Sequence, residues 1–173
     1  MSMDLFQAFV PTARQIVQAG QAVLDKGEAF CAERGMAPET LIETRLAPDM
    51  AALPFQVFSV AHHSAGAIAG VRAGVFKPAR PEAGLDFSGL KALLQGADAV
   101  LAAVTADEMA ALSDKPMVFS IGDRQMPFVA ADFLLSFSQP NFFFHASMLY
   151  GILRHAGVGL GKIDFLGRLR LAS

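Results

Sequence analysis

The sequence is short of charge. Charged residues make up only 17% of it and hydrophobic residues 53%, whereas a typical soluble domain has about 25% charged residues. The 14 Lys and Arg nearly balance the 16 Asp and Glu, which leaves a formal net charge of −2. Such a chain has no broad positive field to attract phosphate backbones, so we expect no nucleic acid among its partners.

Long apolar runs and an export signal are also missing. A membrane-spanning helix needs about 20 consecutive apolar residues, but the most apolar stretch, residues 128–150, is interrupted by Asp132 and Pro140. The first nine residues carry Asp4 and lack the positive segment and uninterrupted apolar run of a signal peptide. We therefore expect a cytosolic protein with no membrane partner.

Cysteine occurs once, at Cys31, so no internal disulfide can form. We interpret Cys31 as a small core residue rather than a reactive thiolate, since Arg34 is the one basic residue near it in sequence. At 173 residues the chain suits one domain, residues 1–173, with a substantial core. The remaining outlet for the excess apolar surface is a subunit interface, which predicts a homodimer.

Helical periodicity, with proline or capping residues before each run and glycine after most of them, predicts an all-α fold. Short accessory helices are expected over Pro38–Thr44 and from Thr105. The four long helices are predicted from Pro11 to Glu33, from Pro48 or Asp49 to about Ala73, from Asp86 or Ser88 to near Val104, and from Pro140 to Gly157. Together they predict a four-helix bundle.

The segments outside these helices carry turn signals. Gly122-Asp123 separates two short runs, Met117–Ile121 and Gln125–Val129, which predicts a small β-hairpin before the last helix. Lys77–Gly84 is predicted to be an exposed loop. The glycine-rich segment Gly157–Gly167 is predicted to be an extended tail that packs on the bundle.

Three of the four histidines lie on the predicted second and fourth helices. His62 and His63 are on the second, and His145 is on the fourth with Asn141 four residues before it, so Asn141 and His145 share one helix face. Facing helices of a bundle can hold a divalent cation in this way. The alternative is that the histidines satisfy core hydrogen bonds and that Asn141 caps the helix. An amide oxygen is moreover a weak substitute for imidazole at a zinc site.

Two other sequence patterns resemble functional motifs but do not predict a binding or catalytic site. Gly157, Gly159 and Gly161 loosely resemble a phosphate-binding loop, but no strand precedes them, so a tight C-terminal turn is the better interpretation. Ser64 follows His63 directly, yet adjacent helix positions point about 100° apart and do not form a nucleophile–base pair.

Several segments, in matching order along nearly the whole chain, resemble a bacterial family of domains of unknown function that is grouped with the DinB/YfiT-like metalloenzymes. These segments are Leu24-Asp-Lys26, Arg45-Leu-Ala-Pro-Asp-Met50, Gln56-Val57, Pro140-Asn-Phe-Phe-Phe-His145, Ile152-Leu-Arg-His155, Gly157-Val158 and Gly161-Lys-Ile-Asp-Phe-Leu-Gly167.

The resemblance implies a three-histidine site for nickel, zinc or a similar divalent ion. One ligand comes from the second helix and two, four residues apart, come from the fourth. His145 matches the later of these two, and Asn141 stands where the earlier histidine is expected. His62 or His63 matches the second-helix ligand, although relatives often have aspartate where His62 stands.

The resemblance also implies an activity, since some members resemble transferases or isomerases that use low-molecular-weight thiols. We therefore hypothesise a divalent-metal-dependent enzyme, thiol transferase or hydrolase-like, with a degenerate site at His62, His63, Asn141 and His145. The alternative is a non-catalytic protein that binds a small molecule or another protein and holds no metal.

Overall fold

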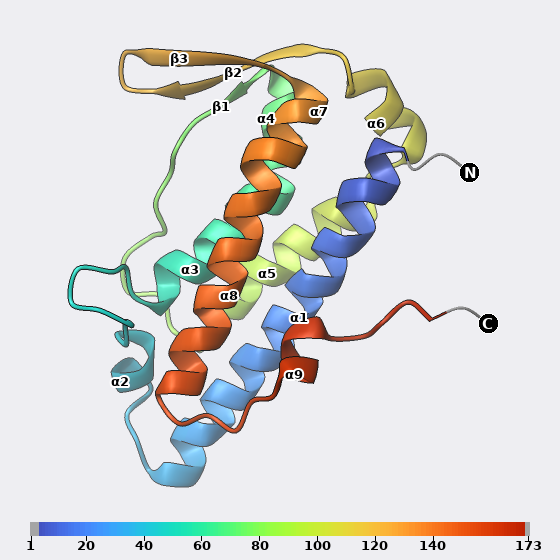
Figure 1. Ribbon diagram of the computed structural model, residues 1–173. Helices are drawn as coiled ribbons and strands as arrows, with labels where there is room; N and C mark the ends of the chain where they lie inside the picture. The colour runs from blue at the N-terminus through green and yellow to red at the C-terminus, as the bar shows by residue number, and fades with distance from the viewer. Residues whose placement is uncertain (1–3, 172–173) are drawn as a thin grey trace.

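The computed structural model describes residues 4–171 and places long helical rods side by side, with a small sheet across one end (Figure 1). In chain order the elements are α1 (Leu5–Arg34), α2 (Pro38–Ile42), α3 (Leu53–Ala61), the π-helical turn η1 (His62–Gly66), α4 (Ala67–Ala73), β1 (Val75–Phe76), α5 (Phe87–Ala102), α6 (Ala106–Leu112), β2 (Pro116–Ile121), β3 (Arg124–Val129), α7 (Ala130–Asp132), the π-helical turn η2 (Phe133–Ser138), α8 (Gln139–His155) and α9 (Lys162–Leu166).

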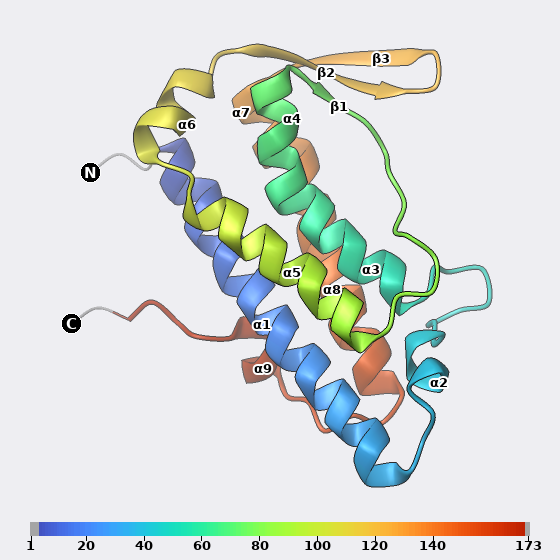
Figure 2. The ribbon, with the colours of Figure 1, turned by 180° about the vertical axis from the view of Figure 1, so that it is seen from behind.

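Four rods form the bundle. They are α1, the continuous run α3–η1–α4, α5, and the continuous run α7–η2–α8, which we call the first to fourth rods. Figure 1 has α8 in front, and Figure 2 shows α5 on the opposite side, lying across α1 and α3. The predicted all-α four-helix bundle with short accessory helices is confirmed.

The first rod begins earlier than predicted. Pro11 was expected to start it, but α1 begins at Leu5, and the carboxylate of Asp4 caps it by accepting the Gln7 N–H at 2.7 Å. Pro11 lies inside the helix and removes one backbone hydrogen bond. The side chains of Phe9 and Val10 are fully buried, and this packing offsets the loss. At the other end Gly35 closes the helix in the left-handed conformation, with φ 59°.

The second rod begins later than predicted, because Pro54 rather than Pro48 lies in its first turn. Its predicted end is confirmed, since Gly74 follows Ala73 with φ 72°. The rod buries one face in the bundle, which consists of Leu53, Val57, Val60, Ser64, Ile68 and Val71. The opposite face is half-buried at Phe55 and Phe58.

The prediction that Pro140 begins a helix is wrong, because Pro140 lies inside the fourth rod. The backbone is already helical from Ala130, and the π-helical turn η2 ends at Ser138, two residues before the proline. A proline inside a helix lacks the N–H for the carbonyl four residues earlier and crowds that carbonyl. A wider turn directly before the ring relieves this conflict, so the helix continues through Pro140 to His155.

The predicted β-hairpin is confirmed. Strands β2 and β3 pair antiparallel, with Pro116 opposite Val129 and Ile121 opposite Arg124, and Gly122 turns between them with φ 55°. A third strand, β1, pairs parallel with β2 and was not predicted. It is only two residues long, which is too short for an alternating pattern to reveal.

The glycine-rich tail is not wholly extended, as had been predicted. It contains the short helix α9, whose start is fixed by the Asp164 carboxylate, which accepts the Gly161 N–H at 2.8 Å. Lys26 forms a 2.7 Å ion pair with Asp164, which attaches α9 to α1. Leu160 is buried, as expected for a segment that packs on the bundle.

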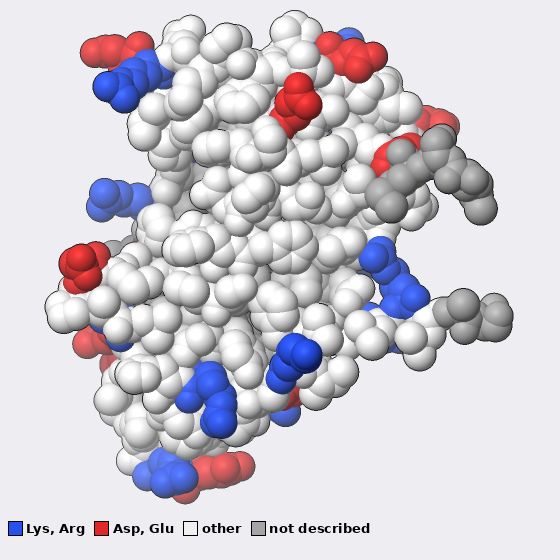
Figure 3. Space-filling view, viewed as in Figure 1, with Lys and Arg blue, Asp and Glu red and all other residues white. Residues whose placement is uncertain are grey.

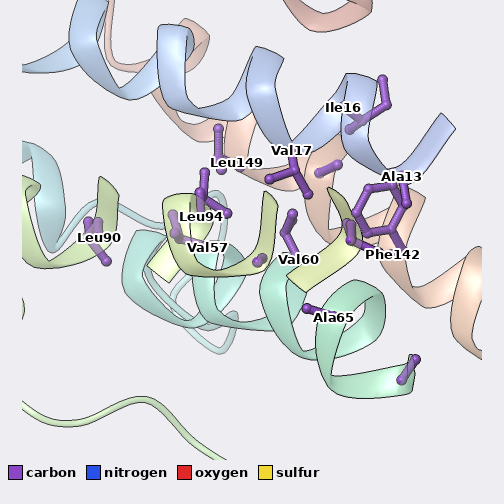
Figure 4. Packing of buried hydrophobic residues seen from close by; sticks show 14 of the residues in the cluster. Ala13, Ile16, Val17, Val57, Val60, Ala65, Leu90, Leu94, Phe142 and Leu149 are labelled. Atoms are coloured by element: carbon purple, nitrogen blue, oxygen red, sulfur yellow. The ribbon is translucent and has the colours of Figure 1, made fainter. Parts of the chain in front are cut away.

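All four rods contribute to the core. Figure 4 shows Val17 of α1, Val57 and Val60 of α3, Leu94 of α5 and Leu149 of α8 packed together. Gly27 lets α1 approach its neighbours closely, because a Cβ atom there would lie 3.3 Å from both Leu153 Cδ2 and Phe87 Cε1. Close packing thus offsets the low helix propensity of glycine within α1.

Within residues 4–171, no single helix has both the length and the apolar character needed to cross a membrane. The bent pair α5 and α6, which meet at 87°, passes that test by length and composition alone. In the bundle, α5 buries Leu90, Leu94 and Leu101 in the core, which accounts for its apolar composition.

Candidate functional site

The candidate site lies where the second rod faces the fourth. His62 and His63 open the π-helical turn η1, and His145 lies in α8. A π-helical turn holds more residues than an α-helical turn and often occurs at functional sites. Three histidines predicted from the sequence therefore lie on two contacting rods, but they do not all face the same way.

His63, and not His62, faces the fourth rod. The ring centroids of His63 and His145 are 6.0 Å apart and the two rings are nearly parallel, at 11°. Of the two neighbouring histidines, His63 is therefore the one that lies opposite His145.

His145 is held by a glutamine from the second rod. Its Nδ1 lies 2.8 Å from Oε1 of Gln56, whose Nε2 donates to the Ala51 carbonyl at 2.9 Å. The amide orientation is thereby fixed, so Oε1 accepts and His145 Nδ1 carries the proton. The neutral ring then keeps its lone pair on Nε2.

Sequence reasoning gave Gln56 no role. Its side chain is only 3% exposed, three residues after buried Leu53 and directly before buried Val57. A polar residue on the apolar face of a helix is the signal that could have identified it, because buried polar groups need partners.

His63 has a similar arrangement with Ser138 of η2. The Ser138 hydroxyl donates to the His63 carbonyl at 3.0 Å, and its oxygen lies 3.4 Å from His63 Nδ1. With the hydroxyl proton used in this way, Nδ1–H donates to Ser138 in a long, weak hydrogen bond and Nε2 keeps the lone pair. Ser138 is fully buried and was also missed by sequence reasoning.

His62 plays a different part. Its Nε2 lies 2.9 Å from the Lys77 carbonyl, which can only accept, so Nε2 carries the proton. The ring stacks between Phe58 and Phe76, with centroids 5.3 and 4.4 Å away. Its other nitrogen, Nδ1, lies against its own helix, where a Cβ atom on Gly66 would be 3.0 Å away. His62 therefore attaches the end of β1 to the second rod.

Asn141 uses its amide nitrogen on its own helix. Nδ2 donates to the Phe137 carbonyl at 2.7 Å. The expected cap at a helix start is therefore wrong, because the helix is continuous here and the side chain bonds a carbonyl within it. Within residues 4–171 no hydrogen bond engages its Oδ1, which leaves one neutral oxygen donor on this half-buried side chain.

Burial keeps these imidazoles neutral. It lowers the pKa of His63 to about 3, and the neighbouring imidazoles His62 and His145 lower it further in the same direction. Burial also lowers the pKa values of His145 and His62. At neutral pH all three rings are uncharged, which is the form that binds metal ions.

The surroundings of the paired rings are aromatic. Phe55 meets the His145 ring at 5.7 Å, Phe144 meets it at 5.2 Å, and Phe137 lies 5.9 Å from the His63 ring. Within residues 4–171, no three His, Cys, Asp or Glu residues come close enough to hold a metal ion together. The donors that the structure brings together here are two imidazole nitrogens, and Asn141 lies one helical turn before His145 on the same rod.

The remaining sequence candidates have structural roles. Burial and the charges of Glu28 and Glu39 raise the pKa of Cys31, so it is no thiolate at neutral pH. Ser64 donates to the Val60 carbonyl at 2.6 Å rather than to a histidine. Gly157 turns the chain after α8 with φ 100°.

Comparisons with known proteins agree with this architecture. The model of a family described as "Domain of unknown function (DUF1993)" matches residues 5–166. No functionally curated protein matches the chain. A crystal structure of a DinB family member from Shewanella denitrificans is similar with a TM-score of 0.83 and 22% identity, covering 98% of this chain and 95% of that one. The chain belongs to the DUF1993 family, whose function is unknown, and its fold is DinB-like.

Proposed function

We propose that the protein is a small-molecule enzyme that depends on a weakly held divalent transition-metal ion. His63 Nε2 and His145 Nε2 are the two principal ligands, and Asn141 Oδ1 is a weaker third. Nickel and zinc are the candidate ions, because neutral imidazole suits both. The reaction class is thiol transfer or hydrolysis.

One observation carries this proposal. Both rings engage Nδ1 in hydrogen bonds with a neighbouring rod, and no hydrogen bond among the described residues 4–171 uses either Nε2. Histidines that bind metals in proteins are typically oriented in this way by a partner on the other ring nitrogen.

The distance between the two rings is short enough for a shared ion. Because the rings are nearly parallel, at 11°, both Nε2 lone pairs meet one ion only where the rings lie close to a common plane. With a metal–nitrogen distance of about 2.1 Å, two imidazoles on one ion have centroids at most about 6.5 Å apart. The observed separation of 6.0 Å falls within that limit. Two imidazoles and one amide oxygen do not make a closed four-ligand zinc site, so positions remain for a substrate.

The chemistry divides between the ion and the chain. A bound divalent ion lowers the pKa of a thiol or water ligated to it. Gln56 and Ser138 hold the two imidazoles in the binding tautomer. Phe55, Phe137 and Phe144 limit the access of water to the paired rings.

Metal titration of tag-free protein tests the proposal. Calorimetry with Zn²⁺ and Ni²⁺, and visible absorption with Co²⁺, should each report one site per chain. The variants His63→Ala and His145→Ala should each abolish metal binding at this site. His62→Ala is the matched control, because this neighbouring ring is also half-buried but already donates Nε2–H to Lys77. The proposal fails if no ion binds or if the control loses binding equally.

A second function, a metal-free small-ligand binder, has one observation in its favour. No third His, Cys, Asp or Glu joins the pair within residues 4–171. If metal titration is silent, thermal shifts against a metabolite library distinguish this function, because a ligand that binds the folded state raises Tm as its concentration exceeds Kd.

A further inference from the structure

The outer face of the fourth rod carries no charge along most of its length. No Asp, Glu, Lys or Arg occurs in residues 133–153. Figure 3, viewed onto α8, shows a broad uncharged surface with an acidic group above it and basic groups below. The exposed residues of this face are Leu135, Ser136, Pro140, Phe144 and Ser147.

Large apolar side chains lie on this face. Phe144 is 55% exposed and Leu135 is 39% exposed. A large exposed aromatic side chain among uncharged neighbours is typical of the centre of a protein interface. Burying it in an interface would also accommodate part of the high apolar content of the chain.

Charges of opposite sign stand at the two ends of the same face. Asp132 is exposed at the end next to the sheet, and Arg154 is exposed at the other end. Within residues 4–171 neither takes part in an ion pair, although other charged side chains do. The two residues are about 33 Å apart along a helix at 1.5 Å per residue.

We propose that a second copy of this chain docks on this face, with the two fourth rods antiparallel about a two-fold axis near Phe144. The midpoint between residues 132 and 154 is residue 143, next to Phe144. An antiparallel pair therefore sets Asp132 of each copy against Arg154 of the other. A parallel pair would set like charges together, which is unfavourable.

This arrangement has a consequence for the candidate site, although it does not depend on a metal there. The Phe144 ring contacts the His145 ring at 5.2 Å. The two-fold axis near Phe144 therefore brings the His145 positions of the two copies close together, and the partner copy covers the surface beside each.

The oligomeric state tests the proposal, measured by light scattering and sedimentation over a range of protein concentrations. The wild-type chain should be a dimer and Phe144→Asp a monomer. Ile163→Asp is the matched control. Ile163 is also an exposed apolar residue, at 63%, but it lies on α9, so this variant should remain a dimer. A monomeric wild type, or a dimeric Phe144→Asp, overturns the proposal.

Charge exchange tests the antiparallel order with exposed residues that leave the core intact. Asp132→Arg and Arg154→Asp should each raise the dimer Kd about tenfold or more, because symmetry places each change in two contacts. The double variant should return to within about threefold of wild type. No recovery in the double variant, or dissociation by Val100→Asp on α5 instead of Phe144→Asp, overturns the proposal.

Discussion

His145 and Gln56 share a hydrogen bond of 2.8 Å between the imidazole Nδ1 and the amide Oε1. The glutamine cannot reverse its amide without losing the 2.9 Å bond from its Nε2 to the Ala51 carbonyl. Two hydrogen bonds in series therefore connect the backbone before α3 to one ring of α8. This chain of contacts sets the tautomer of His145.

Gln56→Leu should weaken both the fold and the site. The substitution leaves the Nδ1–H of His145 and the Ala51 carbonyl without a partner, which should lower the free energy of unfolding by about 1–3 kcal/mol. Loss of the orienting partner should reduce Zn²⁺ affinity about 10- to 100-fold. Urea unfolding and calorimetric titration measure the two effects.

Gln139→Leu is the control for this prediction. Gln139 also donates a side-chain hydrogen bond to a backbone carbonyl, that of Ala8 at 3.1 Å, and within residues 4–171 no hydrogen bond joins it to a histidine. It should cost stability without changing metal affinity. Equal losses of affinity in the two variants would remove Gln56 from the site.

Stability should fall as the solution is acidified. The folded-state pKa of His63 is about 3, below the unfolded value of about 6.5, so the unfolded chain binds more protons in this range. The contribution of neutral His63 to the free energy of unfolding is fully present above a pH of about 6.5 and is lost progressively towards pH 3. At pH 5 the loss should be about 2 kcal/mol.

Urea unfolding between pH 7.5 and 5 measures this dependence. His63→Gln removes the titrating group and should flatten the curve, whereas His155→Gln should not, because His155 is exposed at the end of α8. A curve with the same slope in the wild type and in His63→Gln would show that His63 is accessible to protons in the folded state.

Most of the fold was predictable because local signals agree with it. Asp86, one of the two starts proposed for the third long helix, and Thr105 cap helices as expected, and glycines follow the ends of the first two rods at Gly35 and Gly74. The prediction at Pro140 was wrong because the π-helical turn before the proline, which lets the helix continue, has no recognisable local sequence pattern. The parallel strand β1 was missed for a similar reason, since its partner β2 lies about 40 residues away.

The site was only partly predictable. The sequence placed His62, His63 and His145 on facing helices but could not decide between the first two, since neighbouring helix positions differ only in direction. The π-helical turn η1 changes that direction locally. Gln56 and Ser138 escaped notice because their importance lies in which atom they present to a ring on another rod.

His62→Phe should loosen the segment after β1 without affecting the site. Phenylalanine keeps the stacking on Phe58 and Phe76 but loses the bond to the Lys77 carbonyl, so the free energy of unfolding should fall by about 1 kcal/mol. Hydrogen exchange should speed up in residues 79–85, and Zn²⁺ affinity should stay unchanged. A loss of affinity would instead make His62 a ligand.

Two glycines on helices should respond to alanine with opposite signs. At Gly27 a Cβ atom would lie 3.3 Å from Leu153 Cδ2 and Phe87 Cε1, so Gly27→Ala should destabilise the fold by about 1–3 kcal/mol. Gly96 lies on the exposed side of α5 with nothing within 4 Å of the added atom, so Gly96→Ala should stabilise it by about 0.5–1 kcal/mol. Urea unfolding of both variants measures the contrast. Stabilisation by Gly27→Ala would mean that α1 is free to move away from α5 and α8, and that these rods are not held together by close packing.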